Sequence, residues 1–242
     1  MSRLNRFFFA GTHGLGDLLQ LDAERSNYLC RVLRLREEDT IDIFDGQGGL
    51  YRCRISKAHQ RRAQIQVVEQ LADVDRPEQA PSLAMALLKG QAMDRAIAQA
   101  TELGAQHIWL LQADRSNLPI AAERLEQKMN HWRLVIASAC EQCGQPWLPI
   151  LHPPMSVRAC LAQQTHAMPV VFDPDGDPLP SRADITQPLV FIGPEGGWSD
   201  EEATLFAEQG TARYRLGSTI LRAETMPAVA LALIQQMRGW PH

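Results

Sequence analysis

Three patterns in the sequence predict an α/β protein of two domains. Short strand-like segments separated by glycine turns fill residues 1–72, and a polar segment that contains two prolines, 73–81, follows. From Ser82 onward, apolar strand-like runs alternate with helical segments, which is typical of a parallel sheet covered by helices. We therefore expect a small β-barrel at 1–72, a linker at 73–81 and an α/β domain at 82–242.

The first domain is predicted from short strands with glycine turns and one short helix. The turn at 45–49, Asp-Gly-Gln-Gly-Gly, has the composition that joins two strands of a hairpin. Several such strands within about seventy residues favour a small barrel. The strands are expected at 3–10, 40–44, 50–56 and 63–70, and the helix at 23–32.

The second domain is predicted from buried-type strands, each followed by a turn or a helix. Ser199 begins one helix, because Ser199-Asp200-Glu201-Glu202 fits a capping box. Pro227 suits the first turn of the last helix. That helix is apolar on nearly every side, so it packs either in the core of one subunit or at a contact between subunits. Strands are expected at 83–88, 107–111, 169–172, 189–192 and 213–216, a turn at 173–177, and further helices at 93–103, 121–140 and 227–237.

The net charge, the apolar runs and the cysteines limit the classes of function that this protein can have. The 242 residues carry a net charge of −4, and no apolar run is long enough to span a membrane, so we expect a cytoplasmic protein. The five cysteines do not form a disulfide framework, and the C-x-x-C at 140–143 lacks the second ligand pair of a zinc site, so no metal is expected. Residues 1–72 hold eleven Lys and Arg against nine Asp and Glu, net +2, which leaves −6 for the rest. A basic N-terminal part favours local attraction of RNA, although chance asymmetry explains it equally.

The stretch 189–199, LVFIGPEGGWS, joins a strand to a helix through a glycine-rich loop. In open α/β sheets, ligands bind in loops at the carboxyl ends of strands. Glu195 lies in the loop and three acids fill the first helical turn, and these would repel a phosphate. The loop therefore suits a neutral or cationic ligand that the backbone approaches closely. An ordinary strand-to-helix turn with two permissive glycines is the alternative interpretation.

A second motif, LGSTILRAET at 216–225, follows a short strand. The pair, GPEGG followed by LGxxILRxET, resembles the signature of the ribosomal RNA uridine-N3 methyltransferases (the RsmE family) of the SPOUT superfamily. RVLRL at 31–35 and FDGxG at 44–48 resemble the N-terminal domain of that family, so the likeness covers nearly the whole chain. Four positions depart from the family pattern, where His, Lys, Arg and Arg are usual: Asn27, Gln99, Gln145 and Thr219.

The resemblance implies both a fold and an activity. The fold is a C-terminal SPOUT α/β trefoil-knot domain preceded by a small PUA-like β-barrel that binds RNA. The activity is transfer of a methyl group from S-adenosylmethionine to N3 of a specific uridine in 16S ribosomal RNA of the small ribosomal subunit. The resemblance also implies a homodimer formed through the C-terminal domain.

The resemblance assigns roles to individual residues. Arg222 is expected nearest the chemistry, with a salt bridge to Glu224 or Glu195 as its alternative role. Glu195 either caps loop amides or offsets the charge of the sulfonium. The residues expected to bind the cofactor are Phe172, Ile192, Gly193, Pro194, Glu195, Gly196, Gly197, Leu216, Gly217, Ile220, Leu221, Arg222, Glu224 and Thr225. The residues expected to contact RNA are Arg6, Arg31, Arg34, Lys89 and Arg115, with solvated surface as the alternative for the first three.

Two other functions stay open at this point. One is a different SPOUT reaction, methylation of the ribose 2′-oxygen. The other is a non-catalytic RNA-binding assembly factor, because a fold does not determine a function. The intact GPEGG and LRxET motifs favour catalysis.

Overall fold

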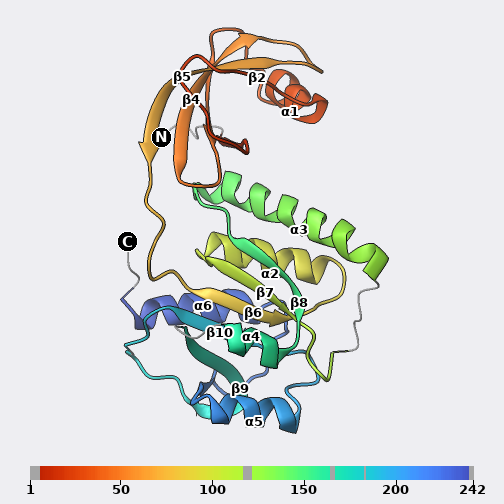
Figure 1. Cartoon of the computed structure of the whole chain (residues 1–242), viewed down its shortest axis with the longest axis vertical. Coiled ribbons are helices and arrows are strands. Elements are labelled where there is room, and N and C mark those ends of the chain that lie inside the picture. The colour runs from red at the N-terminus through yellow and green to blue at the C-terminus, as the bar shows by residue number, and fades with distance from the viewer. Residues whose placement is uncertain (1–5, 117–121, 164–166, 183, 240–242) are drawn as a thin grey trace. The chain divides into compact units, whose positions relative to one another are not determined.

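A computed structural model describes residues 6–116, 122–163, 167–182 and 184–239 (Figure 1). The chain forms two compact units. The first contains Met1–Arg76 together with Cys140–Leu148, and the second contains Pro77–Ala139 together with Pro149–His242. No pattern in the sequence indicated that Cys140–Leu148 belongs to the first unit.

The first unit is a half-barrel of five strands with one helical segment. The ladder order is β1-β3-β4-β5-β2, and the ladders of the described residues do not close the sheet between β1 and β2. The β1–β3 pair is parallel and the other pairs are antiparallel. The elements are β1 (Arg6–Phe8), β2 (Leu18–Gln20), α1 (Ala23–Asn27) with the π-helical turn η1 (Tyr28–Val32), β3 (Thr40–Phe44), β4 (Gly49–Lys57) and β5 (Gln64–Asp73).

The core of the first unit follows from alternation along its strands. Buried and partly buried residues alternate through the first seven positions of β4, as expected for a strand with one face on a core. Ile41, Ile43 and Ile55 are fully buried in that core. The buried Ser26 hydroxyl accepts a hydrogen bond from the backbone N–H of Ala63, 2.9 Å away, so the helical segment is tied to the sheet.

Several contacts join Cys140–Leu148 to the rest of the first unit, and three of them use the side chains of Glu141 and Trp147. The Phe8 N–H donates to the Glu141 carboxylate at 2.9 Å, and burial raises the pKa of that carboxyl. The Trp147 indole N–H donates to the Val74 carbonyl at 2.8 Å. The Arg76 guanidinium lies over the Trp147 ring, 5.3 Å from its centroid. These contacts link segments more than seventy positions apart in the sequence, which is why no local pattern reveals them.

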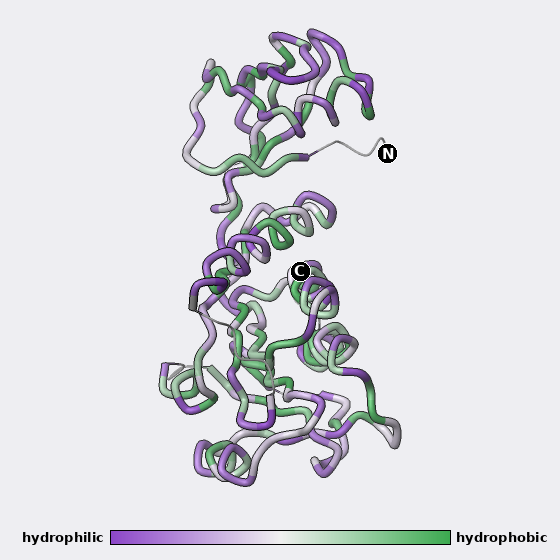
Figure 2. Tube along the Cα trace, turned by 90° about the vertical axis from the view of Figure 1, so that its right-hand side faces the viewer, coloured by the Kyte–Doolittle hydropathy of each residue, from purple (hydrophilic) through white to green (hydrophobic). Residues whose placement is uncertain are grey.

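The second unit contains a six-stranded sheet in the order β11-β9-β10-β6-β7-β8, and every neighbouring pair is parallel. The apolar stretches drawn green in Figure 2 run through this sheet. The α/β class expected from the sequence is therefore confirmed. The elements are β6 (Ser82–Ala86), α2 (Gln91–Glu102), β7 (His107–Leu111), α3 (Ala122–Cys143), β8 (Ile150–Met155), α4 (Val157–Gln163), β9 (Met168–Pro178), β10 (Pro188–Ile192), α5 (Asp200–Glu208), β11 (Ala212–Arg215) and α6 (Met226–Met237). Of these, α3 reaches with its last residues into the first unit.

Helices cover both faces of this sheet. Leu189 and Phe191 of β10 belong to a buried cluster with Phe206 of α5 and Cys160 of α4. Side chains alternate along a strand, so Val190 faces the opposite side, where α6 packs against β10 and β6. A parallel sheet needs such cover on both faces. Within the described residues no helix combines the length and apolarity that crossing a membrane requires.

Within the described residues, which exclude 3–5 of the first expected strand and 121 of an expected helix, the expected elements are present, most with small shifts of their ends. The exception is β9, which runs through the turn expected at 173–177, and three elements were missed. The strand at 150–155 contains Pro153 and Pro154, which argued against a strand. It is nevertheless β8, at the edge of the sheet, where a missing N–H costs no ladder bond. The segments β2, of three residues, and α4, of seven, are too short for periodicity to reveal them.

A pair of stacked rings links β7 to β8. The His152 imidazole lies flat on the Trp109 indole, with ring centroids 3.4 Å apart and planes 2° apart. His152 Nε2 is 3.0 Å from His107 Nδ1. Burial, followed by the charge of His107, lowers the pKa of His152 to about 4 from its ordinary value of 6.5.

This lowered pKa predicts acid sensitivity. Below pH 6.5 the unfolded chain binds a proton at His152 that the folded chain refuses until about pH 4. The free energy of unfolding therefore falls as the pH drops from 6.5 to 4, by up to about 1.4 kcal/mol per pH unit from this group. Denaturant titrations of the wild type and His152→Phe should show a shallower pH slope for the variant. Equal pH slopes for the two proteins between pH 4 and 6.5 would show that the pKa of His152 is not lowered in the folded protein.

Candidate functional site

A cavity of about 700 Å³ opens at one edge of the second unit's sheet. Its lining comes from three stretches, at 172–174, 192–198 and 216–226. The first lies in β9, and the others follow β10 and β11. These three strands are neighbours in the parallel sheet, so their carboxyl ends meet at the same edge. The cavity is therefore a direct product of strand order.

The first wall is a bulge in β9. The ladder to β11 pairs Val171 with Arg213 and then Asp177 with Tyr214, so 172–176 bulge out of the ladder. The turn expected at 173–177 is thus a bulge within a strand. The Asp173 carboxylate holds its shape by accepting from the Asp175 N–H at 2.9 Å and pairing with the Arg213 guanidinium at 3.0 Å.

Gly176 lets the bulge lie against β11. A Cβ at this position would sit 2.7 Å from the backbone carbon of Tyr214 and 2.8 Å from its nitrogen. Both neighbours are backbone atoms that a side-chain rotation cannot move aside. The Gly176 carbonyl accepts from the Arg215 guanidinium at 3.0 Å, which fixes the end of the bulge.

The second wall is the GPEGG loop. The Gly197 N–H donates to the Pro194 carbonyl at 2.9 Å, and Gly197 adopts φ +70°, a conformation that favours glycine. Trp198 packs beneath the loop, edge-on to Phe191 and Phe206 with ring centroids 6.5 and 5.0 Å away. Trp198 therefore packs the loop against the side chains of the sheet and of α5.

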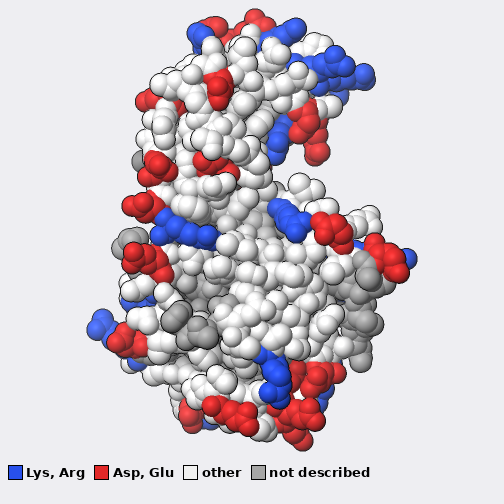
Figure 3. Space-filling view, viewed as in Figure 1, with Lys and Arg blue, Asp and Glu red and all other residues white. Residues whose placement is uncertain are grey.

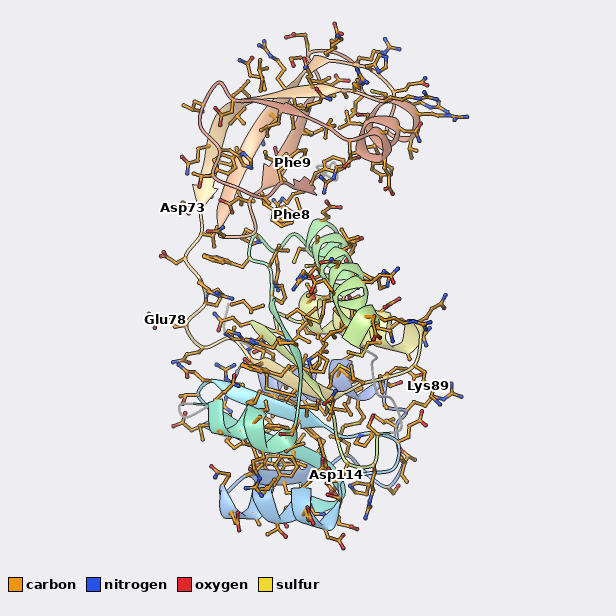
Figure 4. The ribbon with its side chains drawn as sticks, turned by 45° about the vertical axis from the view of Figure 1, so that its right-hand side comes forward. Phe8, Phe9, Asp73, Glu78, Lys89 and Asp114 are labelled. Carbon is orange, nitrogen blue, oxygen red and sulfur yellow. The ribbon has the colours of Figure 1, made fainter. Side chains whose placement is uncertain are left out.

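The loop at 112–116 braces the second wall from behind (Asp114 is labelled in Figure 4). The Ser199 hydroxyl donates to the Asp114 carboxylate at 2.6 Å. The buried Glu202 carboxylate accepts from the N–H groups of Ser199 at 2.9 Å and Asp114 at 3.1 Å. The expected capping box at Ser199 is confirmed, and the same carboxylate also ties the β7–α3 connection to the start of α5.

Arg115 contacts the back of the GPEGG loop. Its guanidinium lies 3.4 Å from the Gly196 carbonyl oxygen and 3.6 Å from the Asp200 carboxylate. A Cβ on Gly196 would meet the Arg115 side chain at 3.3 Å. Gly196 therefore faces Arg115, and it is absent from the lining of the cavity.

The third wall runs from Leu216 to Met226. Gly217 adopts φ +63° at its start. The Arg222 carbonyl accepts from the N–H groups of Thr225 at 2.9 Å and Met226 at 3.1 Å, which forms the turn that leads into α6. Pro227 stands in the first turn of that helix, as the sequence predicted.

Four charged side chains line the cavity: Asp173, Glu195, Arg222 and Glu224. Asp173 is paired with Arg213, and the Glu224 carboxylate lies 3.7 Å from the Arg95 guanidinium of α2. The alternative in which Arg222 pairs with Glu224 or Glu195 is therefore not found. Within the part of the chain that the structure describes, Glu195 and Arg222 are the two lining charges without an ion pair.

The structure brings together the residues that the sequence singled out. All the positions expected to bind a cofactor line the cavity except Gly196 and Thr225. Sequence reasoning missed several lining residues that lie beside the two motifs or in the bulge, and their nearness to the motifs was the one available signal. These are Asp173, Pro174, Trp198, Ser218, Thr219, Ala223 and Met226.

The five residues expected to contact RNA are divided between the two units. Arg6 donates to the Gly144 carbonyl within the first unit. Arg31 and Arg34 are exposed there, and basic and acidic side chains are interspersed on the face drawn in Figure 3. Lys89 is exposed in the turn between β6 and α2 of the second unit, where Figure 4 shows it pointing outward. No group of residues suited to a metal ion occurs in the described ranges.

Comparison with known families gives the class of protein. The family model of an RNA methyltransferase domain matches residues 76–235, and that of an RNA methyltransferase PUA domain matches residues 21–68. The first match covers the sheet and the whole cavity. Fold and site together define an RNA methyltransferase.

Individual relatives narrow the class. Ribosomal RNA small subunit methyltransferase E of Synechocystis is 32% identical over 90% of this chain and 72% of its own length. The Buchnera protein of the same name, from the Acyrthosiphon pisum symbiont, is 27% identical over 98% of this chain and 90% of its own. The chain belongs to the ribosomal RNA small subunit methyltransferase E family.

Two solved structures share the fold over nearly the full chain. A methyltransferase of Legionella pneumophila with bound S-adenosylmethionine is 28% identical, with a TM-score of 0.87 over 96% of this chain and 97% of that one. The ribosomal RNA small subunit methyltransferase E of Neisseria gonorrhoeae, bound to S-adenosylmethionine, is 26% identical, with a TM-score of 0.85 over 97% and 98%.

The bulge predicts a strong effect of a small substitution. Gly176→Ala should lower the free energy of unfolding by about 1–3 kcal/mol, because the added methyl group overlaps the Tyr214 backbone. Gly14→Ala is the matched control, since its Cβ would meet Asp17 at an ordinary 3.7 Å. Urea denaturation measures both. Equal stabilities for the two variants would contradict the close approach.

Proposed function

We propose that this protein transfers a methyl group from S-adenosylmethionine to N3 of a uridine in the 16S ribosomal RNA of the small ribosomal subunit. The observation that carries the proposal is one cavity formed at three adjacent strands, with Arg222, which has no ion pair among the described residues, on its third wall. Family membership and the two relatives solved with S-adenosylmethionine support it.

The residues of the cavity suit this ligand. A volume of about 700 Å³ is in the range of pockets that hold ligands of nucleoside size. Apolar side chains such as Ile192 and Leu221 can cover an adenine, and the glycines let backbone N–H and C=O groups approach closely. The lining acids favour a cation over a phosphate, in agreement with the expectation from sequence.

The chain's own residues divide the work between donor and acceptor. When bound, S-adenosylmethionine supplies an electrophilic methyl group on a sulfonium, whose carbon–sulfur bond breaks as the carbon–nitrogen bond forms. The three walls orient the donor, which is mainly positioning work. Arg222 stabilises negative charge on the uridine as its N3 proton leaves to solvent, because its guanidinium forms no ion pair within the described ranges and is available to the base.

The proposal also covers the oligomeric state, the knot, the compartment and the RNA contacts of the protein. We infer a homodimer through the C-terminal domain, supported by α6, whose Ala228, Val229 and Leu233 are only partly buried. The trefoil knot follows from the family resemblance, and action in the cytoplasm is the expectation from the apolar runs, which are too short to span a membrane. The first unit, which carries the PUA match, supplies RNA contacts through exposed arginines such as Arg31 and Arg34.

A product analysis tests the reaction. Small subunits from cells that lack the enzyme are incubated with it and S-adenosylmethionine, and their RNA is analysed by primer extension and nucleoside mass spectrometry. N3-methyluridine with a strong reverse-transcription stop at one uridine is expected, since N3 methylation blocks the pairing edge. A ribose-methylated product would support the 2′-O reaction, and no product with intact binding would support the non-catalytic factor.

Arg222→Ala should lower kcat by about 10²- to 10³-fold, because the charge on the departing base loses its partner. The dissociation constant for S-adenosylmethionine should change less than about threefold, because the donor is held by the backbone of the walls. Arg158→Ala, which removes an exposed arginine of α4, is the control. Single-turnover methylation and calorimetric titration measure the two quantities, and loss of donor binding in Arg222→Ala would refute this division of roles.

A further inference from the structure

The charges that line the cavity are unevenly compensated. Arg213 neutralises Asp173 and Arg95 neutralises Glu224, and both cations come from outside the lining. Glu195 has no such partner in the described chain, although it stands on the second wall. One uncompensated carboxylate therefore remains on the side of the GPEGG loop.

Methyl transfer changes the charge of the ligand that occupies this cavity, and the inference rests on the proposed function at this point. S-adenosylmethionine carries a sulfonium, whereas the product S-adenosylhomocysteine carries a neutral thioether. The remaining groups of the two molecules are the same. Any fixed negative charge near the sulfur thus favours the substrate over the product, and a neutralised carboxylate does so less.

We propose that Glu195 makes the pocket discriminate between S-adenosylmethionine and S-adenosylhomocysteine. Its carboxylate attracts the sulfonium and has no comparable interaction with the thioether. This attraction promotes exchange of product for substrate after each turnover. The loop geometry adds to the effect, because the Trp198 ring lies against Gly193 before Glu195, and the Asp114–Ser199 contact holds the backbone after it.

The expected size is modest because Glu195 is exposed at the cavity. Water and salt screen a charge in this position, so we expect a three- to tenfold effect at low ionic strength. The effect should shrink as salt is added. Screening by salt is a signature that loss of loop structure would not produce.

The test is a comparison of dissociation constants by calorimetric titration. The ligands are S-adenosylmethionine, S-adenosylhomocysteine and sinefungin, an analogue with an ammonium group in place of the sulfonium. In Glu195→Gln the preference for S-adenosylmethionine over S-adenosylhomocysteine should fall three- to tenfold. The preference for sinefungin over S-adenosylhomocysteine should fall by a similar factor, because the neutral glutamine side chain does not attract a cationic ligand more than a neutral one.

Two variants separate charge from structure. Glu195→Asp keeps the charge and should retain most of the preference. Glu201→Gln removes an exposed acid from the first turn of α5, outside the cavity lining, and should leave the preference within twofold of the wild type. If Glu201→Gln lowered the preference for S-adenosylmethionine as much as Glu195→Gln does, the proposal would be overturned, because the preference would then depend on net charge alone.

The outcomes also separate this inference from the proposed function. A wild type that binds both ligands, with an unchanged ratio in Glu195→Gln, overturns the role of Glu195 and leaves the methyltransferase intact. A wild type that binds neither ligand, with or without small subunits, overturns the proposed function and this inference together.

Discussion

The parallel pairing of β11, β9 and β10 is the constraint on which the site depends. Backbone hydrogen bonds between these strands bring three carboxyl ends to one edge, and each end contributes a wall of the cavity. As a result, residues 172, 195 and 222 line the same cavity although they are far apart in the sequence. Helices on both faces bury the strands and hold this edge in shape.

Around that edge, irregular backbone is held by specific partners. The Asp173–Arg213 ion pair holds the β9 bulge, and Trp198 holds the GPEGG loop. The capping box at the start of α5 also binds the connection between β7 and α3. Such local contacts replace the ladder bonds that the loops lack. The result is a pocket whose three walls consist mainly of restrained backbone. Among the described residues, its charges without an ion pair are those of Glu195 and Arg222.

Much of this site could be predicted because its signals are local. The capping pair Ser199 and Glu202, the residue Pro227 and the motifs GPEGG and LGSTILRAET can each be recognised within ten residues. The bulge could not be predicted, since its partner Arg213 lies forty positions away. The contact of Arg115 with the GPEGG loop could not be predicted either, because Arg115 and Gly196 are far apart in the sequence. The prolines of β8 argued against a strand because edge position is a property of the sheet and not of the segment.

The first unit is formed by two separate segments of the chain, and this restricts the order in which the protein can fold during synthesis. The Glu141 and Trp147 side chains complete its hydrogen bonds, so its structure cannot be finished until residue 148 has left the ribosome. By then the first strands of the second unit have already been synthesised. The two units therefore cannot fold strictly one after the other, and the RNA-binding part cannot be exchanged between relatives as a single contiguous cassette.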